Sequence, residues 1–320
     1  MESRKKYIFG PVPSRRLGTS LGVDIVQYKT CSMNCVYCEC GRTDKFTLER
    51  KEYVPIDDVI AQLDEHLAEK PELDYITFSG GGEPTLNSGI GKIIRFVKGK
   101  YPQYKMCLLT NGSFFGSDDL IEDLKDIDLV VPSFDASNDS ELMKINIPCP
   151  GITVEGLIEG YVKFRSRVKC QFWLEIFIVP GVNDSEESIA AFADAVRRIA
   201  PDKVQLNTLD RPGWADWIRP APEDEIRRFI GPIEKFAPVE TIGKFKYKTR
   251  GVSKNRTAAE IDEALKILIT GRPSTIEDIA FSLGIEKQAA SESLARLEAA
   301  HAISRDKRDR GIFFMINKGY

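Results

Sequence analysis

The sequence predicts an α/β protein, a partial (β/α)6 barrel followed by a small C-terminal winged-helix domain. Two observations support this prediction. From Leu21 to about Arg211, apolar runs alternate with amphipathic stretches, which is the pattern of strand–helix units repeated around a parallel sheet. After Thr257, a helix–turn–helix pattern and a hairpin replace that alternation.

Six apolar runs have the β-branched and aromatic enrichment of buried strands, at residues 21–26, 73–79, 104–110, 128–134, 170–179 and 203–209. Helices are predicted between them, at residues 56–69, 90–100, 117–125, 154–167 and 185–200. Thr153 and Asp184 are suited to cap the last two helices. Right-handed crossovers would then curl the six strands into a partial barrel.

The composition changes after Arg211, where prolines and tryptophans interrupt the alternation and a basic stretch, residues 244–256, follows. This change places a domain boundary near Thr257 and gives domains at residues 1–256 and 257–320. The second domain is predicted to hold three short helices with Gly284 at a turn and with inward apolar residues Ile276, Ile279, Ala280, Leu283, Ile285, Ala290, Leu294 and Leu297. A hairpin, residues 302–304 and 312–316 around a tip at 305–311, would complete the winged helix.

The overall composition excludes several classes of protein. Hydrophobic residues make up 42% and charged residues 29% of the 320 residues, as is typical of a globular protein. No apolar run has the length of a signal peptide or a membrane span, so we expect a cytoplasmic protein without a membrane partner. The net charge of −3 provides no overall attraction for nucleic acid. Seven cysteines, four of them within residues 31–40, favour metal binding over a disulfide framework.

The segment KTCSMNCVYCECG carries Cys31, Cys35 and Cys38, spaced C-x3-C-x2-C directly after the first predicted strand. A loop there lies at the carboxyl-terminal mouth of a barrel, where such folds place their chemistry. Three thiolates can bind three irons of a cubane cluster and leave one iron open to another ligand. The spacing alone leaves two alternatives, a zinc knuckle or a cluster with four cysteine ligands that include Cys40.

A glycine tract follows the second predicted strand in the segment ITFSGGGEPTL. Gly80, Gly81 and Gly82 would let the backbone approach a ligand closely, and Glu83 would bring a carboxylate to the same barrel mouth. The alternative interpretation of the glycines is a tight strand-to-helix turn.

Taken together, the two motifs resemble the radical S-adenosylmethionine (radical SAM) superfamily, in which C-x3-C-x-aromatic-C follows the first strand and GGE follows the second. The resemblance covers about residues 21–209. The tract GPVPSRRLGTSLGVD is similar, more narrowly, to a group of uncharacterised iron–sulfur oxidoreductases of anaerobes that are distantly related to wyosine-base synthases. This narrower likeness implies an anaerobic enzyme but no particular substrate.

The resemblance implies a role for each motif residue. A [4Fe–4S] cluster would be ligated by Cys31, Cys35 and Cys38, and its fourth iron would be chelated by the amino and carboxylate groups of SAM. Tyr37 would lie beside the adenine. The SAM amino group would be received by Gly81, Gly82 and Glu83.

Polar residues at later strand ends are further candidates for SAM contacts. They are Asn111, Ser133, Asp135 and Asn207. For each of them, a turn or cap is an equally good interpretation, because such side chains readily bond to nearby backbone.

The implied reaction is reductive cleavage of SAM to methionine and a 5′-deoxyadenosyl radical, which abstracts hydrogen from a substrate. It requires a low-potential electron donor of the flavodoxin or ferredoxin type. Candidate substrate contacts are Arg15 and Arg16 before the first strand, Glu175 within the fifth, and Arg211, Trp214 and Trp217 after the sixth. Salt bridging and core packing are the alternatives for these residues.

The predicted winged helix leaves several functions open. Its second helix carries Glu286, Glu292 and Glu298, a poor surface for phosphates, whereas basic residues gather in the wing at Arg305, Lys307, Arg308 and Arg310. We therefore favour an RNA or a protein or peptide as the substrate, docked with the winged helix, with a small molecule as a third possibility. A different class of function is a redox sensor that uses the cluster for sensing and the winged helix for DNA.

Overall fold

The computed structural model describes residues 5–14, 16–242, 257–271, 273–308 and 311–317. Its larger part is an eight-stranded sheet in the order β1 (Ile8–Ser14), β2 (Gly18–Val23), β5 (Tyr75–Phe78), β6 (Met106–Thr110), β7 (Leu129–Pro132), β8 (Gln171–Phe177), β9 (Lys203–Asn207) and β10 (Val239–Thr241). Among the described strands of this sheet, all neighbours are parallel except β1 and β2. The chain is therefore a mixed α/β protein with a parallel sheet, consistent with a partial barrel.

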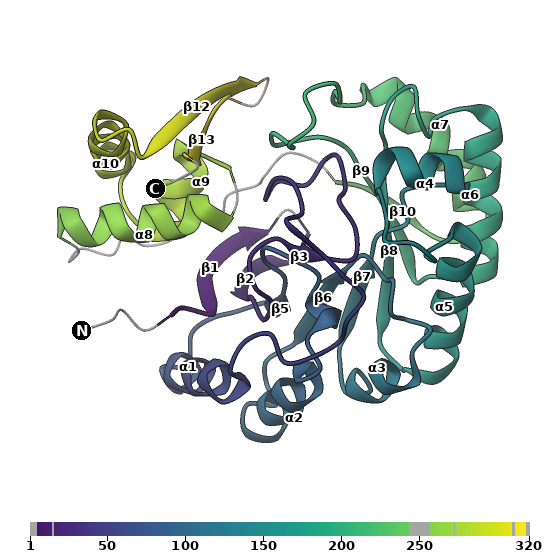
Figure 1. Cartoon of the computed structure of the whole chain (residues 1–320), viewed down its shortest axis with the longest axis horizontal. Coiled ribbons are helices and arrows are strands. Elements are labelled where there is room, and N and C mark those ends of the chain that lie inside the picture. Colours follow the sequence, from purple (N-terminus) through teal and green to yellow (C-terminus); the bar gives the residue numbers. More distant parts are fainter. Residues whose placement is uncertain (1–4, 15, 243–256, 272, 309–310, 318–320) are drawn as a thin grey trace.

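Helices connect the parallel strands and line the outer side of the sheet (Figure 1). They are α1 (Ile56–Ala68), α2 (Ile90–Lys100), α3 (Asp118–Asp123), α4 (Asp139–Ile145), α5 (Val154–Arg167), α6 (Glu186–Ile199) and α7 (Glu223–Glu234). The sequence of α6 explains its packing, because Ile189, Phe192, Val196 and Ile199 recur at helical spacing and all are buried in the main core. Shorter elements are β3 (Thr30–Cys31), β4 (Lys45–Phe46) and a 3-10 turn at Pro84–Leu86.

The six predicted strands and five predicted helices each have a counterpart in the structure, with ends shifted by up to three residues. The elements that were not predicted include β1, β10 and α4. β1 contains Pro11 and Pro13, which cannot donate to a ladder and which therefore favour an edge strand over a central one. β10 has three residues and α4 has seven, too few to show a clear period.

The predicted cap of α6 was wrong by one residue. Ser185, not Asp184, is the N-cap, and its side chain accepts a hydrogen bond from the Ser188 N–H. Asp184 instead accepts the Gly181 N–H at 2.8 Å and so closes the preceding turn. The cap of α5 is Thr153, as expected, accepting from the Gly156 N–H.

The C-terminal unit, the described residues from 257 to 317, has three helices and a three-stranded antiparallel sheet. Its elements are α8 (Ala258–Gly271), β11 (Ser274–Thr275), α9 (Ile276–Leu283), α10 (Lys287–Ala299), β12 (Ile303–Arg308) and β13 (Gly311–Ile316), with strand order β11-β13-β12. Gly284 ends α9 with φ 60°, a left-handed conformation that suits glycine. The unit has its own apolar core, and Val12 of β1 packs into it.

The predicted hairpin tip, residues 305–311, was too long. β12 continues to Arg308, which pairs in register with Gly311 of β13. The error has a physical cause. β12 is an edge strand, and edge strands often carry charged residues, which in a sequence are also typical of a loop. The basic connector, residues 244–256, and Arg310 of the predicted wing lie outside the described residues.

Candidate functional site

The cysteine loop lies beyond β2, at the carboxyl-terminal end of the parallel strands. All three predicted ligands accept a hydrogen bond from an N–H group through sulfur. The donors are the Met33 backbone to Cys31, the Asn146 amide to Cys35 and the Lys29 ammonium to Cys38, each at 3.4 Å. Such donors favour a thiolate, which is the form of cysteine that binds metal.

Burial and neighbouring charges have opposite effects on these thiols. Burial raises the pKa of Cys31 and raises that of Cys35 to about 12. A hydrogen bond with Cys40, assisted by the Lys29 charge, lowers the pKa of Cys38 to about 6. A bound metal would displace the protons of the first two thiols, since thiolate ligation and proton release are coupled.

The three thiols are suited to a cubane cluster, in which each thiolate binds a different iron. Among the described residues, no three His, Cys, Asp or Glu side chains are arranged around one metal ion. A cubane cluster does not need that arrangement, because each thiolate binds a different iron. The same loop borders a cavity at the carboxyl-terminal ends of the strands, which is described below, through Cys35, Cys38 and Cys40. A cluster held there would face this open space.

The glycine tract packs against the cysteine loop. A Cβ on Gly82 would lie 2.1 Å from the Thr30 carbonyl oxygen, and a Cβ on Gly81 would lie 2.6 Å from the Tyr28 ring. Hydrogen bonds join the same segments, from the Lys29 N–H to Gly81 O and from the Glu83 N–H to Thr30 O. The glycines therefore permit a close approach of chain to chain, in addition to any approach to a ligand.

Glu83 is buried at 3% exposure and lines the cavity. Its Oε1 accepts from the Thr85 N–H, the Thr85 hydroxyl and the Thr110 hydroxyl, and its Oε2 accepts from the Asn111 N–H at 2.8 Å. Burial raises the pKa of Glu83, and these hydrogen bonds oppose the rise. The carboxylate is thus held rigidly at the ends of β5 and β6.

A cavity of about 570 Å³ lies at the carboxyl-terminal mouth of the sheet. It brings together most of the predicted site residues from separate strand ends. Those that line it are Arg16, Cys35, Tyr37, Cys38, Gly81, Gly82, Glu83, Asn111, Ser133, Glu175, Asn207 and Arg211. The predicted residues that do not line this cavity are Cys31, Asp135, Trp214 and Trp217, and Arg15 lies outside the described residues.

Asp135 supports the site from behind. Its Oδ2 accepts from the Tyr37 hydroxyl and from the Asn146 amide, and its Oδ1 accepts from the Phe177 N–H at 3.0 Å. The same Asn146 amide reaches the Cys35 sulfur. Asp135 thus makes anchoring contacts within the protein, and its contact with SAM stays a prediction.

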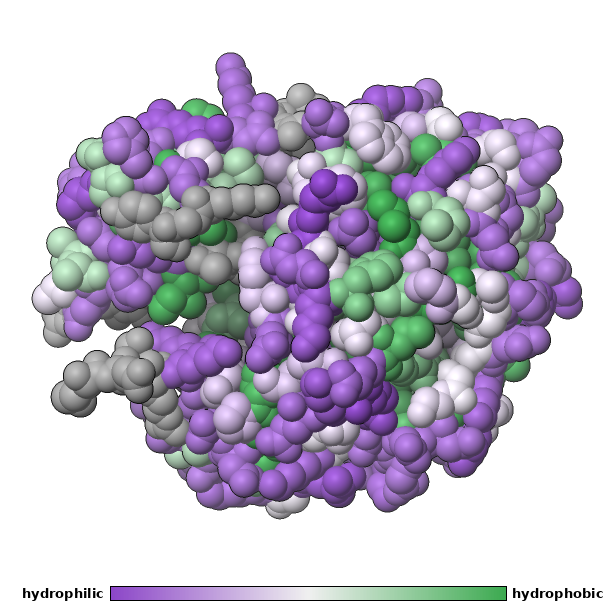
Figure 2. Space-filling view, viewed as in Figure 1, coloured by the Kyte–Doolittle hydropathy of each residue, from purple (hydrophilic) through white to green (hydrophobic). Residues whose placement is uncertain are grey.

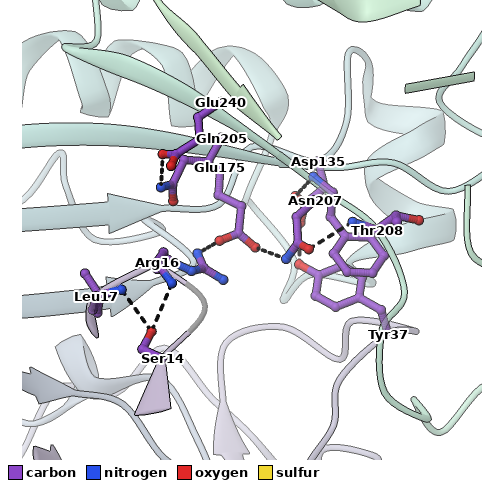
Figure 3. A network of polar contacts seen from close by, with 11 residues as sticks. Ser14, Arg16, Leu17, Tyr37, Asp135, Glu175, Gln205, Asn207, Thr208 and Glu240 are labelled. Carbon is purple, nitrogen blue, oxygen red and sulfur yellow. Dashed lines mark hydrogen bonds and ion pairs between the residues drawn. The ribbon is translucent and has the colours of Figure 1, made fainter. Parts of the chain in front are cut away.

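Glu175 and Asn207 form a polar chain across the cavity (Figure 3). The Arg16 guanidinium forms an ion pair with Glu175, and the Asn207 amide donates to the other Glu175 oxygen at 3.0 Å. Figure 3 shows Tyr37 on the far side of Asn207; its ring stacks on Phe177 with centroids 4.0 Å apart. Glu175 is thus a paired carboxylate that borders the cavity, and its contact with substrate stays a prediction.

The tryptophans after β9 do not reach the cavity lining. The Trp214 indole N–H donates to the Cys35 carbonyl at 2.8 Å, and the Arg42 guanidinium lies 4.6 Å from the Trp214 ring. Trp217 is 53% exposed. Trp214 therefore holds the cysteine loop through Cys35, and its contact with substrate stays a prediction.

Two residues of the site had not been singled out from the sequence. Lys29 is buried at 3% exposure beside Cys38, and Asn146 joins Cys35 to Asp135. Lys29 lies two residues before Cys31, so its proximity to the cysteines in the sequence was a usable signal. Asn146 had no such signal, because it follows α4, far along the chain from the thiol it contacts.

Comparison with known proteins agrees with this geometry. Residues 25–193, more than half of the chain, match the Radical SAM superfamily. The chain belongs to the radical SAM superfamily, whose enzymes use a [4Fe–4S] cluster and S-adenosylmethionine as cofactors. No helix in the described part of the chain has the length and apolar character needed to cross a membrane.

Among curated proteins, the chain is similar to the UPF0026 protein MJ1312 of Methanocaldococcus jannaschii. The two are 33% identical over 245 residues, which is 76% of this chain and 74% of that protein. It is also 34% identical over 295 residues to the GTPase Obg of Brachyspira hyodysenteriae, covering 92% of this chain. The chain spans only 43% of that relative's length.

Solved structures share the fold at low identity. A radical SAM methyltransferase from Sphaerobacter thermophilus has a TM-score of 0.55 and 19% identity, over 69% of this chain and 66% of that one. SuiB of Streptococcus suis, bound to S-adenosylmethionine, has a TM-score of 0.51 and 13% identity, over 69% and 50%. At these identities the likeness concerns the fold alone.

Proposed function

We propose that the protein cleaves S-adenosylmethionine at a [4Fe–4S] cluster and uses the resulting 5′-deoxyadenosyl radical to abstract hydrogen from a substrate. The observation that carries this proposal is the convergence of the cysteine loop and Glu83 on one cavity. The cluster, when bound, supplies the electron for cleavage of the SAM carbon–sulfur bond. The protein supplies ligands, position and exclusion of water.

The residues have distinct proposed roles. The cluster ligands are Cys31, Cys35 and Cys38, with the Lys29, Asn146 and Met33 donors stabilising their thiolates. The methionine portion of SAM would bind at Gly81, Gly82 and Glu83. Its adenosine would lie near Tyr37, Asn111, Ser133 and Asn207, which border the same cavity. The candidates for substrate contact remain Arg15, Arg16, Glu175, Arg211 and Trp214, of which Arg16, Glu175 and Arg211 border the cavity.

The test compares the wild type with Cys35→Ala after anaerobic reconstitution, using dithionite and SAM. We expect 5′-deoxyadenosine from the wild type and none from the variant. The matched control is Cys170→Ala, a cysteine that precedes β8 and does not border the cavity. Equal product from Cys35→Ala, or none from a fully loaded wild type, would reject the proposal.

We further propose that the C-terminal unit is a winged helix and that the domain boundary lies near Thr257. Two arginines of this unit that could contact RNA are already paired with acids. Arg305 pairs with Glu298, and Arg296 pairs with Asp262 at 2.7 Å. The same two pairs reduce the positive charge available to DNA phosphates in the alternative of a redox sensor.

Two expectations from the sequence remain proposals. One is an electron donor of low potential, of the flavodoxin or ferredoxin type. The other is a cytoplasmic, anaerobic setting, in which an exposed cluster edge would survive. Purification in air should then lower the iron content relative to anaerobic purification.

A further inference from the structure

The C-terminal unit contributes directly to the lining of the cavity. Ile267 and Leu268 of α8 border it, beside Phe9 and Val12 of β1. Figure 2 shows apolar side chains at the seam where the C-terminal unit meets the larger part of the molecule. Helix α9 also packs against β1. One side of the cavity is therefore made by two elements far apart in the sequence.

A buried ion-pair chain connects this unit to the cysteine loop. The Arg211 guanidinium is 4% exposed and lies 3.1 Å from Glu39 and 3.6 Å from Asp278. Glu39 lies between Cys38 and Cys40, and Asp278 is a fully buried residue of α9. An arginine that faces two acids from different segments fixes those segments relative to each other, because its planar fork offers several donors at once.

Asp278 also has a local role in α9. It completes the capping box with Thr275, accepting the Thr275 N–H while the Thr275 side chain accepts the Asp278 N–H. The capping box holds the carboxylate in place, so that the position of Arg211 and that of the helix are coupled. A buried charge pair of this kind is costly to break on one side only.

We infer that the C-terminal unit is the outer wall of the reaction cavity, held to the cysteine loop by Arg211, and that a small substrate binds against this wall through an apolar group. This inference rests on the proposed function for its substrate part. In this inference Arg211 is a positioning residue, which acts through Glu39 and Asp278.

The size and lining of the cavity indicate the substrate class. A volume of about 570 Å³ is that of a site for one ligand of moderate size, and SAM would have to share it. The share left for the substrate is therefore small. The side formed by Phe9, Val12, Ile267 and Leu268 is apolar, so an apolar group there would avoid the cost of burying an unpaired polar group. Arg16 and Glu175 offer charged contacts at another part of the same cavity.

The wall is tested with Asp278→Asn, which removes the charge but keeps an acceptor for the Thr275 N–H. We expect several-fold faster hydrogen–deuterium exchange in β1 and α9, and several-fold faster removal of iron from the reconstituted protein by a ferrous chelator. The matched control is Asp262→Asn, which breaks an ion pair inside the C-terminal unit. Wild-type rates in a folded Asp278→Asn variant would overturn the inference.

Arg211→Lys is the second variant, for use if Asp278→Asn does not fold. Lysine keeps the charge but lacks the fork that reaches both acids, so the same acceleration is expected. Exchange in β1 is measured on protein without a cluster and needs no SAM cleavage. A result that contradicts the inferred position of the C-terminal unit is thereby distinguished from a result that contradicts the proposed chemistry.

The substrate class is tested with a cell extract separated by ultrafiltration into small molecules and macromolecules. Each fraction is added to the reconstituted protein with SAM and dithionite, and 5′-deoxyadenosine is quantified. We expect the small-molecule fraction to stimulate the wild type several-fold and to lose this effect with Ile267→Trp. The control is Glu263→Trp, which introduces the same tryptophan at an exposed position of α8. Stimulation by the macromolecules alone, or by neither fraction, overturns the inference.

Discussion

At the scale of single residues, the glycine tract shows how two segments of the site depend on each other. The residues on either side of Gly82, Gly81 and Glu83, form backbone hydrogen bonds with the cysteine loop. The Thr30 carbonyl oxygen occupies the space where a Cβ of residue 82 would lie. The second motif thus shapes the first. A change at the glycine should therefore be detected at the cysteines.

Gly82→Ala should reduce the iron and sulfide bound after anaerobic reconstitution. The reason is steric: a Cβ would lie 2.1 Å from Thr30 O, so the loop that carries Cys31 must shift. The control is Gly99→Ala in α2, where an added Cβ meets no described atom within 4 Å. That change should leave iron binding intact and stabilise the fold by about 0.5–1 kcal/mol. Full iron content in Gly82→Ala would contradict the expectation.

The site residues that could be predicted from the sequence all lie within or next to a short contiguous motif. Cys31, Cys35, Cys38 and Glu83 carry their chemistry in neighbouring letters of the sequence. Asp135 bonds to Tyr37 and Phe177 within the protein, and these partners could not be predicted, because an aspartate at a strand end has the same sequence pattern whether it faces a ligand or the protein. Only three-dimensional placement separates these cases.

His66 gives a pH prediction at the same scale. It is half-buried on α1, burial lowers its pKa, and its Nε2 has no hydrogen-bond partner among the described residues. A histidine whose pKa is lowered by folding contributes stability above its ordinary pKa, near 6.5, and loses it as the pH falls through the folded value. The free energy of unfolding should therefore decrease below about pH 6.5.

This contribution should be absent in His66→Gln, because glutamine does not titrate. The measurement is the urea midpoint of wild type and variant between about pH 5 and 7.5, the range in which histidine ordinarily changes charge. His301→Asn serves as the control, since His301 is exposed and asparagine tolerates its φ of 57°. Parallel pH profiles for wild type and His66→Gln would count against a role for His66.

At the scale of elements, helix boundaries were accurate where apolar periodicity was long, and less accurate where a single side chain decides. Asp184 and Ser185 are both good caps, and the sequence does not choose between them. In the structure Ser185 is the cap, because the Asp184 side chain already accepts a hydrogen bond from the Gly181 N–H in the preceding turn. The cap therefore depends on the loop before the helix.

Ser185→Ala should lower the free energy of unfolding by about 1 kcal/mol, since it removes the acceptor for the Ser188 N–H. Ser185→Asn, another good cap, should restore most of the loss. Both are measured by urea denaturation at neutral pH. A wild-type midpoint for Ser185→Ala would show that Asp184 can take over the cap.

At the scale of the whole molecule, a change of sequence pattern predicted a second unit but did not predict how that unit docks. The helix–turn–helix periodicity and Gly284 describe the interior of the C-terminal unit. Docking depends on Val12, Arg211 and Asp278. The sequence around each of these residues does not indicate which distant residue it contacts. β1 is the connecting element, because it pairs with the sheet through β2 and packs on the C-terminal unit.

Val12→Ala should therefore lower the unfolding temperature of the C-terminal unit more than that of the sheet. Val12 is 6% exposed and belongs to the core of the C-terminal unit, although its strand belongs to the sheet. Removing two methyl groups should cost about 1.5 kcal/mol, at about 0.8 kcal/mol for each buried group. Val97→Ala in α2, fully buried in the main core, is the matched change on the other side. Hydrogen exchange read segment by segment along a temperature series measures both; equal shifts in the two units for Val12→Ala would mean that they unfold as one.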